Sequence, residues 1–170
     1  MGSNPARATI TMKIQEHIAN LTRHINLVRE ACEILSERLM AEGHKEMAVK
    51  LLARGYVHDN SKFYGIEWDY LHNGQEVPEE ALSLAIKQHN TTNDHHPEFW
   101  GGVDNMPEIA VYEMVCDWYA RSQEFGSSLR DWISDVAIKK YKIKKTGEQY
   151  KWINECLDML LVNYFAKTSD

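Results

Sequence analysis

The N-terminal part of the chain carries an apolar repeat that fits one long amphipathic helix. Between about Thr11 and Ala41 the apolar residues recur at three- and four-residue steps: Ile14, Ile18, Leu21, Ile25, Val28, Leu35 and Leu39. This is the period of an α-helix with one buried face. No stretch of the sequence alternates convincingly with the two-residue period of a half-buried strand. The sequence therefore predicts an all-α fold.

Six further helices are predicted after the first one. Their ranges are about 45–57, 63–71, 78–89, 107–121, 128–141 and 146–165. Pro78 and Pro107 suit the first turn of a helix, and Asn73-Gly74 is a strong turn signal. Residues 90–106 are rich in Asn, Thr, Asp, Pro and Gly and are predicted to be a loop, of a length that is usually functional or disordered.

The length and composition suggest a single globular domain. A chain of 170 residues can bury one core, which we place at about 11–125, with the helices of 128–166 packed on it or available as a dimer face. The formal net charge of −6 works against nucleic acid binding. We expect no membrane span and no secretion signal, a cytoplasmic location and three reduced cysteines, and a homo-oligomer stays open.

Histidine and aspartate occur where one metal ion could be bound. His58 and Asp59 are adjacent at the end of the predicted helix 45–57, and His24 lies on the inward face of the first helix. An imidazole and carboxylate set suits Mn, Fe, Co, Ni or Zn. Asp117 lies among apolar residues of its helix, where an unpaired carboxylate is costly to bury. A metal ion or a basic partner would each compensate for it.

The order of these residues resembles the HD-domain superfamily of metal-dependent phosphohydrolases. The resemblance rests on His24, on His58-Asp59-x-x-Lys62 and on Asp117, and it covers roughly residues 24–120. The segment Asp59-x-Ser61-Lys62-Phe63, with His89 and His95-His96-Pro97-Glu98, is similar to a small group of uncharacterised HD-like proteins. That closer similarity implies a fold but no activity.

The resemblance implies a bundle of about six to seven helices with a divalent transition metal at its centre. The implied ligands are His24, His58, Asp59 and Asp117. Some members of the superfamily hold a second ion, for which the candidates here are His89 and one of His95 or His96. These histidines are only six positions apart rather than on well-separated helices, so one ion is expected and the second stays open.

The implied reaction is hydrolysis of a small phosphorylated substrate, such as a nucleotide, by water that the metal ion activates. Lys62 could neutralise a phosphate oxygen or could be an ordinary surface lysine. His89, His95 and His96 could instead contact the substrate or transfer a proton to the leaving group. Two other classes remain open, namely a di-iron oxygenase and a metal-binding or regulatory protein without catalysis.

Overall fold

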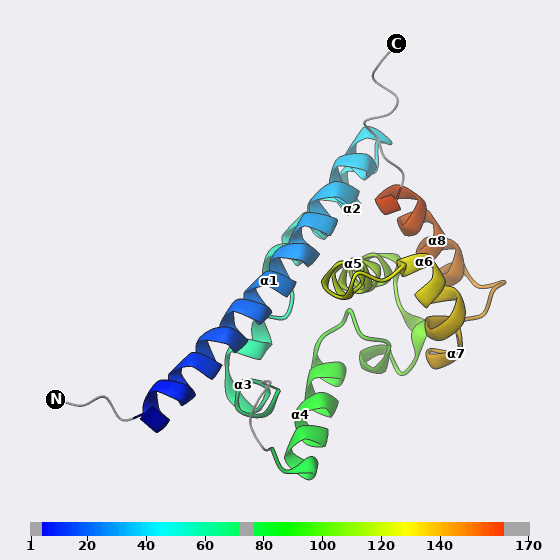
Figure 1. Cartoon of the computed structure of the whole chain (residues 1–170). Helices are drawn as coiled ribbons and strands as arrows, with labels where there is room; N and C mark the ends of the chain where they lie inside the picture. The colour runs from blue at the N-terminus through cyan, green and yellow to red at the C-terminus, as the bar shows by residue number, and fades with distance from the viewer. Residues whose placement is uncertain (1–4, 72–76, 162–170) are drawn as a thin grey trace.

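The computed structural model describes residues 5–71 and 77–161, which form helices and turns without any strand. The prediction of an all-α fold is confirmed. The long helix α1 (Pro5–Ala41) runs along one side, and α2 (Lys45–Val57) packs back along it. Helix α5 (Glu108–Phe125) lies at the centre of the molecule. It lies between α1 and the group formed by α6 (Leu129–Trp132), α7 (Ile138–Lys140) and α8 (Glu148–Leu161) (Figure 1).

Several helix ends differ from those expected from the sequence. Helix α2 has the predicted bounds, whereas α1 begins earlier, at Pro5, and α5 ends later, at Phe125. Helix α4 (Glu79–Thr92) extends three residues past His89. The hydroxyl groups of Thr91 and Thr92 donate to the carbonyl oxygens of Lys87 and Gln88, four residues earlier. Polar residues that usually favour a loop therefore complete the last turn of this helix.

The predicted loop and two of the predicted helices are divided in the structure. The loop after α4 contains two 3₁₀ helices, Pro97–Trp100 and Val103–Asn105. The predicted helix 63–71 is a 3₁₀ helix, Asn60–Phe63, followed by α3 (Gly65–Tyr70). The predicted helix 128–141 consists of α6 (Leu129–Trp132), a π-helical turn (Ile133–Ala137) and α7 (Ile138–Lys140). Asn73-Gly74 lies outside the described residues, and α8 is described over Glu148–Leu161.

The core is formed where α1, α2, α5 and α8 meet. Leu35, Leu51, Val115 and Ile153, one from each helix, are fully buried there. Gly55 allows α2 to approach α1 closely, because a Cβ atom at this position would lie 2.7 Å from the Cβ of Cys32. The three cysteines are free and buried in the same core. Among the helices described here, none combines the length and the apolar character that crossing a membrane requires.

Candidate metal centre

Four segments bring the predicted site residues together. Helix α1 supplies His24, and the turn after α2 supplies His58 and Asp59. The last turns of α4 supply His89, and the loop that follows supplies His95 and His96. Helix α5 supplies Asp117. These side chains form one cluster, which is buried except for the partly exposed His96 and Asp117.

Asp59 lies at the centre of the cluster. Its backbone has a φ of 57°, in the left-handed region that aspartate tolerates better than most residues. Its Oδ2 lies 3.7 Å from Nε2 of His24 and 3.6 Å from Nε2 of His58. Its Oδ1 lies 3.4 Å from Nε2 of His89 and 3.5 Å from Nε2 of His95. One carboxylate therefore faces a different pair of imidazoles with each of its oxygens.

The first pair of imidazoles also faces Asp117. Oδ1 of Asp117 lies 3.0 Å from Nε2 of His24 and 4.0 Å from Nε2 of His58. The four residues expected to bind a metal, His24, His58, Asp59 and Asp117, are thus brought together.

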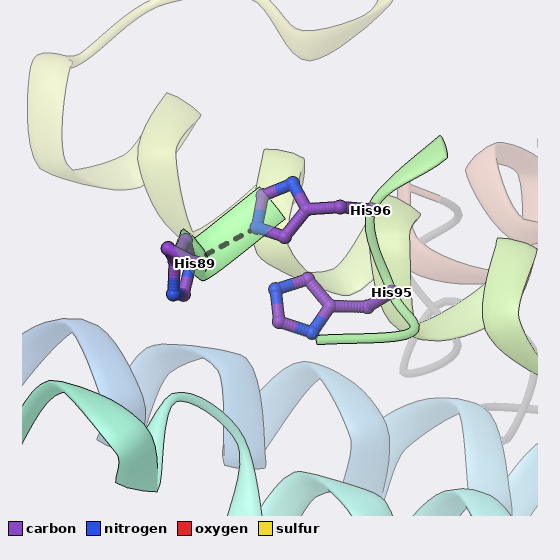
Figure 2. A group of neighbouring side chains, drawn as sticks. All are labelled: His89, His95 and His96. Atoms are coloured by element: carbon purple, nitrogen blue, oxygen red, sulfur yellow. Dashed lines mark hydrogen bonds between the residues drawn. The ribbon is translucent and has the colours of Figure 1, made fainter. Parts of the chain in front are cut away.

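The second group consists of three histidines around the other oxygen of Asp59. Figure 2 shows that the rings of His95 and His96 both point toward His89. Nε2 of His96 makes a hydrogen bond of 3.0 Å with Nε2 of His89, so one of these nitrogens donates and the other accepts. His95 is the more deeply buried of the neighbouring pair, with 3% exposure. Both members of that pair face the site, which the sequence left undecided.

The polar atoms that point into the cluster lack the partners that buried atoms normally have. Nε2 of His24, His58 and His95 and Oδ1 of Asp59 are buried, and none makes a hydrogen bond within the part of the chain that the structure describes. Such atoms are rare in folded proteins, and a bound water, ligand or ion usually satisfies them. The ligand atoms of His24, His58 and Asp59 lie within 4.8 Å of one another, as do those of His89, His95 and His96. These buried groups can therefore hold a metal ion.

Carboxylates behind the histidines set their orientation. Oε1 of Glu113 lies 2.8 Å from Nδ1 of His58 and 3.5 Å from Nδ1 of His95. Oε2 of Glu67 lies 2.8 Å from Nδ1 of His89. A carboxylate that accepts from Nδ1 leaves the lone pair of Nε2 free, which is the usual arrangement behind a metal-binding histidine.

The remaining histidine, His24, has a carboxylate nearby but makes no hydrogen bond through Nδ1 within the described residues. Oε1 of Glu124 lies 3.4 Å from Nδ1 of His24. None of these glutamates was among the residues predicted from the sequence. Glu113, Asp117 and Glu124 are spaced by four and seven residues, so a polar stripe along one face of α5 could have revealed two of them. Glu67 has no comparable signal, because its short helix shows no clear period.

Arg54 links the supporting carboxylates to the loop that carries His95. Its guanidinium donates from Nε to Glu113 and from Nη1 to Oδ2 of Asp94, the second at 3.0 Å. The indole N–H of Trp100 donates to the carbonyl oxygen of Asp94 at 2.7 Å. The residue next to His95 is therefore held from two sides, which fixes the position of this histidine.

Lys62 belongs to the site rather than to the open surface. Its Nζ lies 2.6 Å from Oδ2 of Asp59, and its side chain is 17% exposed. Lys62 also lines a cavity of about 510 Å³ that opens onto His24 and His89. Arg23 and Arg121 line the same cavity, so three cationic side chains and the carboxylate of Glu124 face this space beside the cluster.

The cluster shifts the pKa values of its members in different directions. Burial opposes ionisation of Asp59, but His58 and Lys62 outweigh it and hold the pKa of this carboxyl well below its usual range. Burial also opposes protonation of His58, yet the carboxylates of Asp59 and Glu113 raise its pKa to about 9. Burial and the neighbouring His58 lower the pKa of His95 to about 3. The cluster thus combines an ionised carboxylate with at least one neutral imidazole at pH 7.

The fold and the cluster define an all-helical protein with a buried histidine and carboxylate centre able to hold a metal ion. A family of unknown function (DUF5662) matches residues 13–159, and the chain belongs to this family. The match covers α1 from Lys13 onward and extends into α8, so it includes every residue of the cluster. Searches of the curated proteins and of the solved structures find no match to the chain.

Proposed function

We propose that this protein is a metal-dependent phosphohydrolase of the HD type that acts on a small phosphate ester. The observation that carries the proposal is the position of Asp59, whose two oxygens each face a pair of imidazoles. Carboxylates that contact two groups of ligands in this way are typical of sites that hold two neighbouring divalent ions. The order His24, His58-Asp59 and Asp117 along the chain is the order that the resemblance to HD domains implies.

The residues that would hold an ion fall into two groups that share Asp59. His24, His58 and Asp117 complete the first group, and His89 and His95, with His96 nearby, complete the second. The nitrogen-rich sets suit Mn, Fe, Co, Ni or Zn better than Mg or Ca. When bound, a divalent ion supplies Lewis acidity, which polarises a phosphoryl oxygen and makes water a stronger nucleophile.

The cations around the cluster favour an anionic substrate. Lys62, Arg23 and Arg121 line the cavity that leads to His24 and His89. Arg121 is only partly engaged, since it contacts Glu124 at 3.0 Å and keeps 48% of its side chain exposed. Guanidinium and ammonium groups bind phosphate oxygens through charge-assisted hydrogen bonds. This charge pattern is the reason for preferring phosphate ester hydrolysis to oxygen activation at the same ligand set.

Besides lining the cationic cavity, Lys62 contacts Asp59 directly. Its ammonium group neutralises the same oxygen, Oδ2, that faces His24 and His58. An incoming cation therefore competes with Lys62 for this oxygen, and a released ammonium group would be free to contact a phosphate oxygen. We propose that Lys62 binds substrate rather than only stabilising the fold.

His96 differs from its neighbours in what it contacts. It bonds to His89 and lines a second cavity, next to Asp117. Burial and the nearby His89 lower its pKa to about 4, which keeps the imidazole neutral at pH 7. A neutral imidazole can serve as a ligand or accept a proton, but it has none to donate from a charged form. We therefore assign His96 an accepting role rather than that of a general acid.

The test is metal content and hydrolysis in an isosteric variant of the central carboxylate. Asp59→Asn keeps the size of the side chain and tolerates the left-handed backbone, so it separates the loss of charge from misfolding. The matched control is Asp69→Asn, at an exposed aspartate of α3. Metal is measured by elemental analysis, and hydrolysis is measured with p-nitrophenyl phosphate in the presence of Mn²⁺.

We expect the parent and Asp69→Asn to hold one or two equivalents of metal and to hydrolyse the ester. Asp59→Asn should lose both properties and stay folded by circular dichroism. Full activity in Asp59→Asn would refute the site assignment. Metal binding with oxygen consumption that requires Fe, and without hydrolysis, would replace the hydrolase with an oxygenase.

A further inference from the structure

A second cavity borders the metal cluster next to the cationic one. It has a volume of about 290 Å³, and it is lined by Asp117 and His96 from the cluster itself. Arg121 and Phe125 line both cavities. A group that binds in this second cavity would therefore be adjacent to the ligands of the cluster and within reach of the same arginine.

The walls of this cavity are aromatic. Trp118 comes from α5, Trp132 from the end of α6, and Tyr141 follows α7. The rings of Trp118 and Tyr141 are stacked, with centroids 5.5 Å apart and an angle of 16° between their planes. Trp118 and Trp132 meet edge to face, with centroids 5.1 Å apart. Three aromatic surfaces at one small cavity suit a flat ring better than a flexible chain.

Two cationic side chains line the cavity, together with the carboxylate of Asp117. Lys140 lines it, with its ammonium group 4.8 Å from the centroid of the Tyr141 ring. Arg121 also lines it and is shared with the cationic cavity. A ring with acceptor atoms at its edge, attached to a phosphate group, would match both the aromatic walls and these two cations.

The π-helical turn between α6 and α7 explains how the aromatic walls are assembled. Trp132 and Tyr141 are nine residues apart, and in an uninterrupted α-helix such residues face roughly opposite directions. The wider turn of Ile133–Ala137 changes this phase, and both side chains line the same cavity. π-helical turns inside helices occur frequently at functional sites. The turn is therefore a second observation, besides the aromatic lining, that points to this cavity.

Phe125 adds an exposed aromatic surface at the rim. It is 76% exposed and is the last residue of α5, immediately before Gly126 with a φ of 61°. Because this ring borders two cavities and is largely exposed, it offers a large apolar surface to a ligand.

We propose that this aromatic cavity, lined by Trp118, Trp132, Tyr141, Lys140 and Arg121, binds the flat ring of a phosphorylated ligand whose phosphate lies at the metal cluster. The inference rests on the proposed function for the position of the phosphate. It goes beyond that function by defining the substrate class, phosphate monoesters whose alcohol carries an aromatic ring, of which nucleoside monophosphates are one example. Trp132 and Tyr141 are then the residues that determine specificity.

Binding of paired probes to the full chain tests the inference. The probes are the phosphonate analogues of adenosine 5′-monophosphate and of ribose 5-phosphate, in which a carbon–phosphorus bond replaces the hydrolysable ester bond. They share the phosphonate and the sugar, and only the first carries a ring system. Calorimetry measures both affinities in the parent, in Trp132→Leu and in the control Trp152→Leu, whose half-buried tryptophan lines a different cavity.

The parent should bind the adenosine probe at least about tenfold more tightly than the ribose probe, which is within the range of one stacked base. Trp132→Leu should remove this preference without changing the affinity for the ribose probe, and Trp152→Leu should keep it. Equal binding of the two probes to the parent would overturn the inference. So would a Trp132→Leu variant that weakens both probes to the same extent.

A second variant keeps the test decisive if Trp132→Leu does not fold. Lys140→Ala changes an exposed side chain of the same cavity, and Lys139→Ala is its neighbouring control. Only Lys140→Ala should weaken the adenosine probe. Because binding is measured without turnover, a ring preference in a protein that hydrolyses no ester would refute the proposed function and keep this inference. Hydrolysis of the ester without any ring preference would keep the proposed function and refute this inference.

Discussion

The substitution Glu113→Gln should weaken metal binding although Glu113 is not itself expected to be a ligand. Its Oε1 contacts Nδ1 of His58 at 2.8 Å and Nδ1 of His95 at 3.5 Å, so one carboxylate orients an imidazole in each donor group. Both carboxylate oxygens of Glu113 accept hydrogen bonds, whereas glutamine has one accepting oxygen and an NH₂ group that donates. In the variant this NH₂ group would face the donor of either His58 or Arg54. Loss of a partner of this kind typically lowers metal affinity about 10- to 100-fold. We expect a loss in the upper part of that range because two imidazoles share Glu113.

The cost in stability should be smaller than that of leaving a charge without a partner. Arg54 keeps its contact with Asp94 in the variant, so the guanidinium remains paired. We expect the loss of one charged hydrogen bond, about 1.5–3 kcal/mol in the free energy of unfolding. The variant should therefore be folded at 25 °C and suitable for measurement.

The assay is calorimetric titration of Mn²⁺ into protein stripped with EDTA and then desalted. The control is Glu46→Gln, at an exposed glutamate that pairs with Lys50. The control should bind Mn²⁺ as the parent does. A folded Glu113→Gln variant with the affinity of the parent would refute the reasoning, because it would mean that Glu113 does not orient His58 and His95 for metal binding.

Three further outcomes follow from the structure. Gly55→Ala should lower the free energy of unfolding, measured in urea, by about 1–3 kcal/mol. The added Cβ would lie 2.7 Å from the Cβ of Cys32 and overpack the contact between α1 and α2. An unchanged urea midpoint would contradict this. Lys62→Met should bind Mn²⁺ more tightly, because a competing ammonium group is removed from Asp59. The same variant should hydrolyse p-nitrophenyl phosphate more slowly. If the Mn²⁺ affinity and the rate of hydrolysis both rose or both fell, the proposed role of Lys62 would be wrong. In metal-free protein the pKa of His58, raised to about 9, gives stability that is full below pH 6.5 and is lost as the pH rises to 9, by roughly 3 kcal/mol. Saturation with metal should abolish this alkaline loss in thermal melts, since a ligating imidazole carries no proton to lose.

The sequence carries a strong local signal for four residues of the cluster. His24 lies on an amphipathic helix whose period identifies its inward face, and Asp117 lies in a segment that is otherwise apolar. His58 and Asp59 follow a helix whose bounds the sequence also predicts. The burial of His24 follows from periodicity, and a buried polar group requires a partner. The set could be proposed before its geometry was known.

Contacts that form where the chain reverses direction could not be predicted from helical periodicity. His89 and His95 are only six residues apart rather than on well-separated helices, so the sequence left a second ion at these histidines open. In the structure α4 continues to Thr92, and the chain then turns back so that both imidazoles face Oδ1 of Asp59. Glu67 reaches His89 from a short helix whose placement depends on tertiary packing. Local propensity contains no information about such an approach.

The π-helical turn is a further feature that the sequence does not predict. Its residues, Ile133 to Ala137, read as part of an ordinary amphipathic helix, and no glycine or proline marks the wider turn. Its cause lies in packing, since Ile133 and Ala137 are both buried against the core while Trp132 and Tyr141 face the cavity. The aromatic cavity was therefore not among the predicted sites, although each of its residues could be read in the sequence.

The left-handed backbone of Asp59 has a consequence for which substitutions the protein can accept. At a φ of 57° glycine and asparagine are the replacements with the least conformational strain, whereas valine, isoleucine and threonine are strongly disfavoured. A library randomised at this position and selected only for stable folding should be enriched in glycine and asparagine. Selection of the same library for retained metal should leave aspartate alone, because it combines the tolerated backbone with two charged oxygens. The difference between the two surviving populations would separate what the fold requires at position 59 from what the metal requires.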